Sequence, residues 1–216
     1  MSAPIRQLRI AICDYGAGNL HSLAKALTAR DGDVRIETDA RLAADPSRTD
    51  LLVLPGVGGF AAAAERLQPA RAPIRQAASN GMPILGICLG MQLFFDASEE
   101  GAGEGLGLID GRVRRLRARR VPQIGWNALM PDERGAASLR DAPATVYYAN
   151  SFVCEPSDAS CVVAWSEHES DRFPACVVGG PASNIAGLQF HPEKSSAAGV
   201  RFLRRLVEQL CAGATV

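Results

Sequence analysis

Three side chains that are far apart in the sequence suit nucleophilic catalysis, and the first is a cysteine. Cys88 lies in the glycine-flanked segment Gly86–Gly90, after an apolar run and before a stretch with helical character. Glycines on both sides of a nucleophile allow the tight strand-to-helix turn known as a nucleophile elbow. The start of the following helix favours a thiolate, and the N–H of Leu89 can donate to an oxyanion. We therefore expect Cys88 to be a nucleophile.

The base for this thiol must be one of three histidines, and His191 is the best candidate. It follows an apolar strand-like run and precedes Pro192, which favours an extended backbone at position 191. In an extended segment, His191 and Glu193 project to the same side, so the carboxylate can orient the imidazole. The predicted catalytic residues are thus Cys88, His191 and Glu193. The other two histidines are expected to be exposed: His21 and His168.

A glycine-rich loop, Pro55–Gly59, follows another apolar run and should lie at the same sheet edge as Cys88. Glycines on both sides of Val57 leave its peptide planes free to reorient. A backbone N–H at Val57 or Gly58 would then complete an oxyanion hole with Leu89. A phosphate-binding loop is the poorer interpretation, because no complete phosphate-binding glycine motif is present.

The elements that must position these residues alternate between strand and helix in the first half of the chain. Apolar runs predict strands at 8–13, 34–36, 51–54 and 83–87, and helical spacing predicts helices from 20 to 27 and from 60 to 78. A short helix is expected over 91–95. This pattern is typical of a parallel sheet covered on both faces. The second half predicts shorter, mostly antiparallel strands at 111–116, 145–153, 161–165, 175–178 and 185–190, and a last helix over 197–211.

Composition excludes several classes of protein. The 216 residues hold 23 Lys and Arg against 23 Asp and Glu, which argues against a general nucleic-acid or membrane-surface binder. We expect no signal peptide or membrane span, and a cytoplasmic location. The six cysteines show no C-x-x-C pair and no metal-ligand spacing. Five are expected to be buried packing residues, with no disulfide, metal or other cofactor.

One dense basic run extends from Arg112 to Arg120. Its alternation within a strand pattern favours a solvated face, with a docking surface or an anion-steering rim as the alternative. No interleaved aromatic residues suggest binding of single-stranded nucleic acid.

Taken together, the segments Gly86–Gln92 and Gln189–Glu193 resemble the class I (triad) glutamine amidotransferases. Within that family, further stretches are similar to the glutaminase subunits of imidazole glycerol phosphate synthase. These stretches are Asp14–Leu20, Pro55–Gly58, Ser98–Glu100, Gly105–Leu108, Gly125–Asn127 and His191–Ser195. The resemblance implies a flavodoxin-like three-layer α/β fold: a mostly parallel central sheet with an antiparallel extension, in a single glutamine amidotransferase domain over residues 1–216.

The resemblance also implies a reaction and its partners. L-Glutamine would lie along the Gly56–Gly58 segment and be hydrolysed to glutamate and ammonia. A (β/α)8-barrel cyclase subunit would form a heterodimer with this chain and receive the ammonia. The cyclase would then make imidazole glycerol phosphate and aminoimidazole-carboxamide ribotide for histidine biosynthesis. The implied substrate contacts are Gly56, Gln92, Glu100, Ser151 and Phe152, and the implied partner contacts are Asn19, Trp126, Asn127 and Lys194.

Two positions depart from the pattern expected of the family. Gln123 and Asn150 occupy positions where a histidine is usual, and neither belongs to the catalytic set. Alternatives remain open at this point. One is the glutaminase subunit of another biosynthetic amidotransferase, of the anthranilate or aminodeoxychorismate type. The others are a non-catalytic scaffold subunit and a thiol hydrolase that acts on another γ-glutamyl substrate.

Overall fold

A computed structural model describes residues 7–16, 20–28, 32–135, 139–181 and 183–213. Its centre is an eight-stranded sheet with the order β2-β1-β3-β4-β13-β12-β11-β8. The strands from β2 to β13 are parallel, and β12, β11 and β8 extend the sheet in antiparallel fashion. Their bounds are Gly32–Glu37 (β2), Leu8–Cys13 (β1), Leu51–Leu54 (β3), Ile84–Ile87 (β4), Ile185–Leu188 (β13), Asp171–Gly179 (β12), Val162–His168 (β11) and Met130–Pro131 (β8). The predicted mostly parallel sheet with an antiparallel extension is confirmed.

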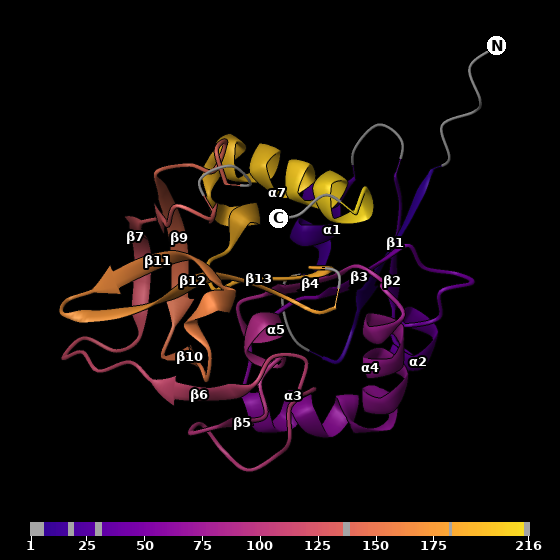
Figure 1. Ribbon diagram of the computed structural model, residues 1–216, viewed down its shortest axis with the longest axis horizontal. Helices are drawn as coiled ribbons and strands as arrows, with labels where there is room; N and C mark the ends of the chain where they lie inside the picture. The colour runs from indigo at the N-terminus through magenta and orange to yellow at the C-terminus, as the bar shows by residue number, and fades with distance from the viewer. Residues whose placement is uncertain (1–6, 17–19, 29–31, 136–138, 182, 214–216) are drawn as a thin grey trace.

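Helices cover both faces of this sheet, which gives three layers (Figure 1). On one face lie α1 (Leu20–Leu27) and α7 (Ser196–Cys211), and on the other lie α2 (Ala40–Ala43), α3 (Phe60–Leu67), α4 (Arg71–Ser79) and α5 (Leu89–Gln92). Strand β1 shows how one strand serves both layers. Ile10 and Ile12 pack in the core cluster of α1 and α7, whereas Ala11 and Cys13 pack in the cluster of α3 and α4.

The long helix predicted over residues 60–78 is interrupted. Residues Gln68–Ala70 form a 3-10 turn that contains Pro69, and α4 starts at Arg71. Pro73 lies in the first turn of α4, where a missing backbone N–H breaks no helical hydrogen bond. The short helix predicted over 91–95 also differs, because α5 begins at Leu89 and ends at Gln92.

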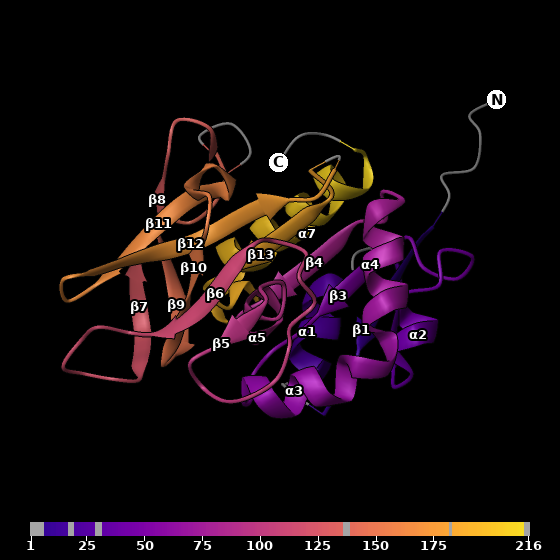
Figure 2. The same ribbon diagram turned by 60° about the horizontal axis from the view of Figure 1, so that its bottom comes forward.

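The β-rich half corrects one predicted strand. The run 145–153 was expected to be a single strand, but it divides at Ser151 into β9 (Thr145–Asn150) and β10 (Phe152–Pro156). The two strands belong to different small sheets, β7-β9 and β10-β6-β5. Their partners are β7 (Gln123–Ala128), β6 (Gly111–Arg115) and β5 (Ala97–Ser98), shown at the left and bottom of Figure 1 and again in Figure 2. The sequence analysis did not predict β7, because its polar residues interrupt the apolar pattern expected of a strand.

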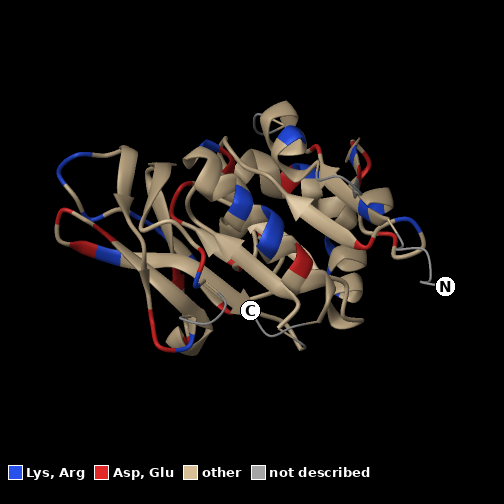
Figure 3. Ribbon diagram, turned by 90° about the horizontal axis from the view of Figure 1, so that it is seen from above, with Lys and Arg blue, Asp and Glu red and all other residues tan. Residues whose placement is uncertain are grey.

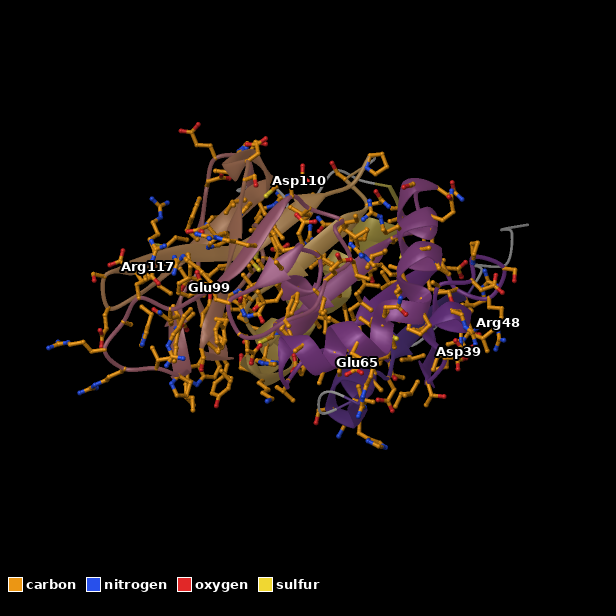
Figure 4. All side chains as sticks on the ribbon, turned by 90° about the horizontal axis from the view of Figure 1, so that it is seen from below. Asp39, Arg48, Glu65, Glu99, Asp110 and Arg117 are labelled. Carbon is orange, nitrogen blue, oxygen red and sulfur yellow. The ribbon has the colours of Figure 1, made fainter. Side chains whose placement is uncertain are left out.

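The arginine run is only partly a solvated face. Arg114 is buried, and its Nη1 and Nη2 each donate to the Asp171 carboxylate at 2.7 Å. Arg117 is exposed at the β-rich end of the molecule, at the opposite end from Asp39 and Arg48 (Figure 4). The prediction of a solvated face is therefore wrong at Arg114, because the Asp171 carboxylate on β12 compensates the burial of its charge.

The placement of charges follows the expectation from composition, and the placement of cysteines follows it in part. On the face seen in Figure 3, positive and negative residues are interspersed over the elements. Of the five cysteines expected to be buried packing residues, Cys13, Cys154 and Cys176 are buried, whereas Cys161 and Cys211 are only half-buried. Burial raises the pKa of Cys13 to about 12 and that of Cys211 to about 11, which keeps both thiols neutral. Within the described part of the chain, no helix combines the length and apolar character needed to span a membrane.

Candidate active site

The predicted nucleophile, base and oxyanion loop converge because they follow three adjacent parallel strands. Strand β4 lies between β3 and β13, and the chain continues from their carboxyl ends to Cys88, Pro55 and Gln189. The N–H of Cys88 donates to the carbonyl of Leu188 at 2.6 Å, which joins the nucleophile segment directly to β13. Open α/β sheets place ligands at this edge. The geometry therefore confirms that these segments share one edge of the sheet.

Cys88 occupies a strained turn. Its φ of 53° and ψ of −105° lie outside the regions that residues with a Cβ normally adopt. The flanking glycines permit the turn: a Cβ at Gly90 would come within 1.9 Å of the Leu54 carbonyl oxygen, and one at Gly86 within 2.6 Å of the Gly90 carbonyl oxygen. Helix α5 starts immediately after Cys88 and has only four residues. The sequence pattern thus corresponds to a true elbow.

His191 and Glu193 form a buried pair. Nδ1 of His191 lies 2.9 Å from Oε1 of Glu193, and the two side chains are 3% and 6% exposed. Burial lowers the pKa of His191, but interactions with Cys88 and Glu193 outweigh it and raise that pKa to about 9. The imidazole is therefore protonated at neutral pH, and Nε2 has no conventional hydrogen-bond partner in the described part of the chain.

The local backbone of this pair differs from the extended geometry expected. His191 itself is extended, with φ −101° and ψ 94°, but Pro192–Lys194 forms a 3-10 turn. This turn folds Glu193 back onto the imidazole instead of placing the two side chains along a strand. The prediction that Glu193 contacts His191 is nevertheless confirmed.

Ser195 and Tyr147 hold the backbone of His191, and the sequence analysis assigned a role to neither. The His191 N–H donates to the Tyr147 carbonyl at 2.8 Å, and the Ser195 hydroxyl donates to the His191 carbonyl at 2.7 Å. The Ser195 oxygen also accepts from the Tyr147 N–H at 2.9 Å. These bonds tie His191 to β9. Ser195 belongs to the stretch His191–Ser195 that carries the resemblance, but nothing in the sequence marks Tyr147 as its partner.

The glycine-rich loop packs against the elbow. A Cβ at Gly56 would lie 2.7 Å from the Leu89 nitrogen, so the loop reaches the predicted oxyanion donor. The side chain of Val57 is 39% exposed, and Gly58 has a φ of 141°, which favours glycine. The buried Tyr15 hydroxyl donates to the Pro55 carbonyl and so fixes the start of the loop. The sequence analysis did not single out Tyr15.

The predicted substrate contacts lie on segments that surround the elbow and the glycine-rich loop. Gln92 is buried, and its Nε2 donates to the Phe152 carbonyl at 2.9 Å, which brings α5 and β10 together beside Cys88. Ser151 precedes β10, and its carbonyl accepts from the Leu116 N–H. Glu100 is exposed and accepts a hydrogen bond from the Phe60 N–H at the start of α3, at 2.8 Å. It therefore reaches the glycine-rich loop from the side of α3.

Three of the four predicted partner contacts lie within the described residues, and Asn19 lies outside them. Trp126 on β7 is 54% exposed and stacks edge-to-face on Tyr147, with ring centroids 6.2 Å apart. Because Tyr147 binds the 191–195 segment, Trp126 and the exposed Lys194 belong to neighbouring elements. The Asn127 amide instead donates to the Glu167 carbonyl. Ile124, which is 68% exposed two residues before Trp126, was missed.

Of the other residues named in the sequence analysis, the two histidines lie away from Cys88, and the two atypical residues pack beside the segment that contacts Gln92. His21 is exposed on α1, and His168 Nε2 lies 2.8 Å from the Arg120 carbonyl oxygen. The two atypical residues Gln123 and Asn150 are direct partners across β7 and β9 and are both buried. The Asn150 amide donates to the Phe152 carbonyl at 3.1 Å, the same oxygen that Gln92 uses.

The fold and this arrangement define a class of protein. Residues 11–209 match the family model described as Glutamine amidotransferase class-I, so the chain belongs to that family. Solved structures agree on the fold. The chain is similar to the structure of PurLQS from Thermotoga maritima, with a TM-score of 0.68 and 20% identity, over 94% of this chain and 99% of the other. A further glutamine amidotransferase from Thermotoga maritima gives a TM-score of 0.65 at 16% identity, over 95% and 98% of the two chains.

Curated relatives narrow the assignment to the HisH subunits of imidazole glycerol phosphate synthase, and the chain belongs to this family. It is 40% identical to the HisH subunit of Gloeothece citriformis, over 93% of this chain and 96% of the relative. It is 41% identical to that of Gloeobacter violaceus, over 94% and 91% of the two chains. The HisH subunit of Halobacterium salinarum is also 41% identical, over 94% of each chain.

Proposed function

We propose that this chain, as the glutaminase subunit of an imidazole glycerol phosphate synthase, hydrolyses L-glutamine with Cys88 as nucleophile. The Cys88 sulfur attacks the side-chain amide carbon and forms a tetrahedral intermediate, whose oxyanion is stabilised by N–H groups of Leu89 and the Val57–Gly58 segment. Collapse expels ammonia, which takes a proton from His191. A water molecule, deprotonated by His191, then attacks the thioester, releases glutamate and restores the thiolate.

One observation carries this proposal: a strained cysteine elbow lies beside a buried His–Glu pair at the ends of two adjacent strands. The N–H of Cys88 donates to the carbonyl of Leu188 at 2.6 Å, three residues before His191, and Cys88 is one of the groups that raise the pKa of His191. A protonated imidazole beside a cysteine sulfur favours the thiolate and can deliver a proton to a leaving group. Neutral packing residues need none of these features.

The protonation state of His191 predicts how kcat/KM for glutamine depends on pH. Its pKa of about 9 means that the proton-donating form is lost as the pH rises through about 9, so kcat/KM should fall there. In Glu193→Gln, one influence that raises this pKa is removed while burial still lowers it. The alkaline limb should then move down by about one pH unit, which makes the rate roughly twofold lower at pH 8 and about tenfold lower at pH 10.

The measurement is kcat/KM for glutamine between pH 6 and 10. Glu65→Gln is the matched control, because Glu65 is exposed on α3 (Figure 4) and the same change there should leave the limb in place. An unchanged limb in Glu193→Gln would contradict the role given to this carboxylate.

The partner in this proposal is a (β/α)8-barrel cyclase subunit that receives the ammonia. Support comes from the names of the relatives, which identify them as subunits of a synthase, and from exposed apolar side chains on β7 next to the base. Ile124 and Trp126 share one face of this strand. We place the docking surface on the outer face of β7, with Lys194 at its margin. The complex would form in the cytoplasm, where amino-acid biosynthesis takes place.

Trp126→Ala should weaken the complex with the cyclase by about 2 kcal/mol, which raises Kd roughly 30-fold, since exposed aromatic residues are frequent interface hot spots. The measurement is titration calorimetry or fluorescence anisotropy with the purified cyclase. Leu42→Ala is the control, because Leu42 is 38% exposed on α2, which lies next to β1 and β2 at the opposite end of the sheet. Equal weakening by both variants would contradict the placement of the surface.

The glycine-rich loop predicts that glutaminase activity depends on the cyclase. We propose that the Val57 peptide presents a carbonyl to the oxyanion site in the free chain and an N–H in the complex, which the glycines on both sides allow. One missing donor lowers the rate by about 10²–10³-fold, so the cyclase should stimulate glutaminase activity by that factor. Steady-state assays with and without the cyclase measure this directly. Full-speed hydrolysis by the free chain would contradict the proposal.

A further inference from the structure

A row of buried carboxamides ends at the catalytic sulfur. Nε2 of Gln189 lies 3.6 Å from Sγ of Cys88, within the range of a hydrogen bond to sulfur. Oε1 of Gln189 in turn accepts from Nε2 of Gln92 at 3.2 Å. The same Gln92 nitrogen donates to the backbone carbonyl of Phe152 at 2.9 Å. Gln189 is 0% exposed and Gln92 is 5% exposed.

The direction of this row is set by the backbone. A carboxamide can present either its oxygen or its NH2 group to a neighbour, so its orientation depends on what surrounds it. The Phe152 carbonyl can only accept, which requires Gln92 to turn its NH2 group toward it. That NH2 group also meets Gln189, which must then offer its oxygen. The NH2 group of Gln189 is left to point at Cys88.

This orientation of the Gln189 amide places a hydrogen-bond donor against the Cys88 sulfur. A hydrogen bond donated to a charged group is stronger than one to a neutral group, so an N–H aimed at sulfur favours the thiolate over the thiol. It also restricts the rotation of the Cys88 side chain, whose backbone is already fixed by the elbow. The amide is neutral and fully enclosed, so it can do this without competing with His191 for a proton.

We propose that Gln189 is a positioning residue that donates to the Cys88 thiolate, and that Gln92 and the Phe152 carbonyl fix its orientation. The proposal deepens the function given above and rests on Cys88 being the nucleophile. It also gives Gln92 a second task beside any contact with substrate. Gln189 has no exposed surface, so it acts through the sulfur and not by touching glutamine.

The test is the rate of Cys88 alkylation by iodoacetamide from pH 5 to 10, in the full chain. Mass spectrometry of the Cys88 peptide separates this reaction from that of the half-buried Cys161 and Cys211. In Gln189→Met, which keeps the length of the side chain and removes the donor, the pH midpoint of alkylation should rise by about one unit. Glutaminase kcat at neutral pH should fall by up to about tenfold, while KM stays within about twofold.

Gln209→Met is the matched control, because Gln209 lies on α7, thirteen residues along the helix from Ser196 and so roughly 20 Å from its start. It should leave the midpoint and kcat unchanged. Gln189→Glu places a carboxylate against the sulfur and should move the midpoint further upward than Gln189→Met. Wild-type midpoints in both Gln189 variants would overturn the proposal.

A measurement on the wild-type chain covers the case in which neither variant folds. The side-chain NH2 signal of Gln189 in an ¹⁵N–¹H spectrum should shift with the same pH midpoint as alkylation, and iodoacetamide should abolish the shift. A Gln189 signal that changes neither with pH nor after alkylation of Cys88 would overturn the proposal. Activity that survives in Cys88→Ala would instead contradict the proposed function, while the alkylation result would still report on the contact between Gln189 and sulfur.

Discussion

Cys88→Ala is expected to abolish glutamine hydrolysis, with kcat lower by at least about 10⁴-fold, because no thioester can form without the sulfur. Alanine keeps a Cβ at the strained φ of 53°, so the backbone meets the same restraint as in the wild type and the fold should be retained. The oxyanion donors and the His191–Glu193 pair remain in place. Any residual rate therefore measures what these groups do for attack by water alone.

Release of glutamate, followed in the presence of the cyclase, measures the loss. Cys154→Ala is the control, since Cys154 is 1% exposed on β10 and burial raises the pKa of its thiol, which keeps it unreactive. This variant should retain activity. Normal turnover by Cys88→Ala would show that the elbow is structural and would leave the non-catalytic scaffold as the better interpretation of the site.

Asp171→Ala is expected to destabilise the fold by about 3–5 kcal/mol, because it leaves Arg114 charged and buried with its main partner removed. The Asp171 carboxylate accepts from Nη1 and Nη2 of Arg114 and from the Arg117 N–H, each at 2.7 Å. The side chains of Arg114 and Asp171 are 6% and 7% exposed. This cluster joins β6 to β12 and so connects the small sheet beside the active site to the central sheet.

Chemical denaturation at pH 7 measures this loss. Arg41→Ala, which breaks the exposed pair with Asp39, should change stability by less than about 1 kcal/mol. Burial raises the pKa of Asp171, but hydrogen bonds from Arg114 and Arg117 outweigh it and hold that pKa below its usual value. The stabilisation is therefore present above about pH 4 and lost as the pH falls through the lowered pKa. A gap between wild type and Asp171→Ala that stays constant down to pH 2 would contradict this account.

The convergence of Cys88, His191 and Glu193 was predictable because it depends on local patterns at the ends of apolar strands. Glycines on both sides of Cys88 and the proline after His191 are short-range signals, and parallel strands bring their carboxyl ends to one edge. The elbow and the position of His191 at the same sheet edge were therefore predicted correctly without knowledge of the strand order, and their catalytic roles stay predictions. The 3-10 turn after His191 was not predicted, since Pro192 is compatible with both geometries.

The supporting contacts were not predictable for a physical reason. Tyr15, Ser195 and Gln189 act on partners 40, 48 and 101 residues away, and nothing in their immediate neighbourhood marks those partners. The division of residues 145–153 at Ser151 has the same cause. Each half suits a strand, and the two sheets that receive them are set by β7 and β6. Burial of Arg114 likewise depended on Asp171, 57 residues further along the chain.

The strained backbone at Cys88 has a consequence for how this sequence can change over generations. Such a conformation costs of order 1–3 kcal/mol, and glycine adopts it with little penalty. Because most proteins lie only a little above the threshold of stability they need, a chain released from selection for activity would gain by losing its cysteine here. Folding alone would therefore favour glycine at position 88, and a cysteine there carries a cost in stability that only a function of its sulfur would offset.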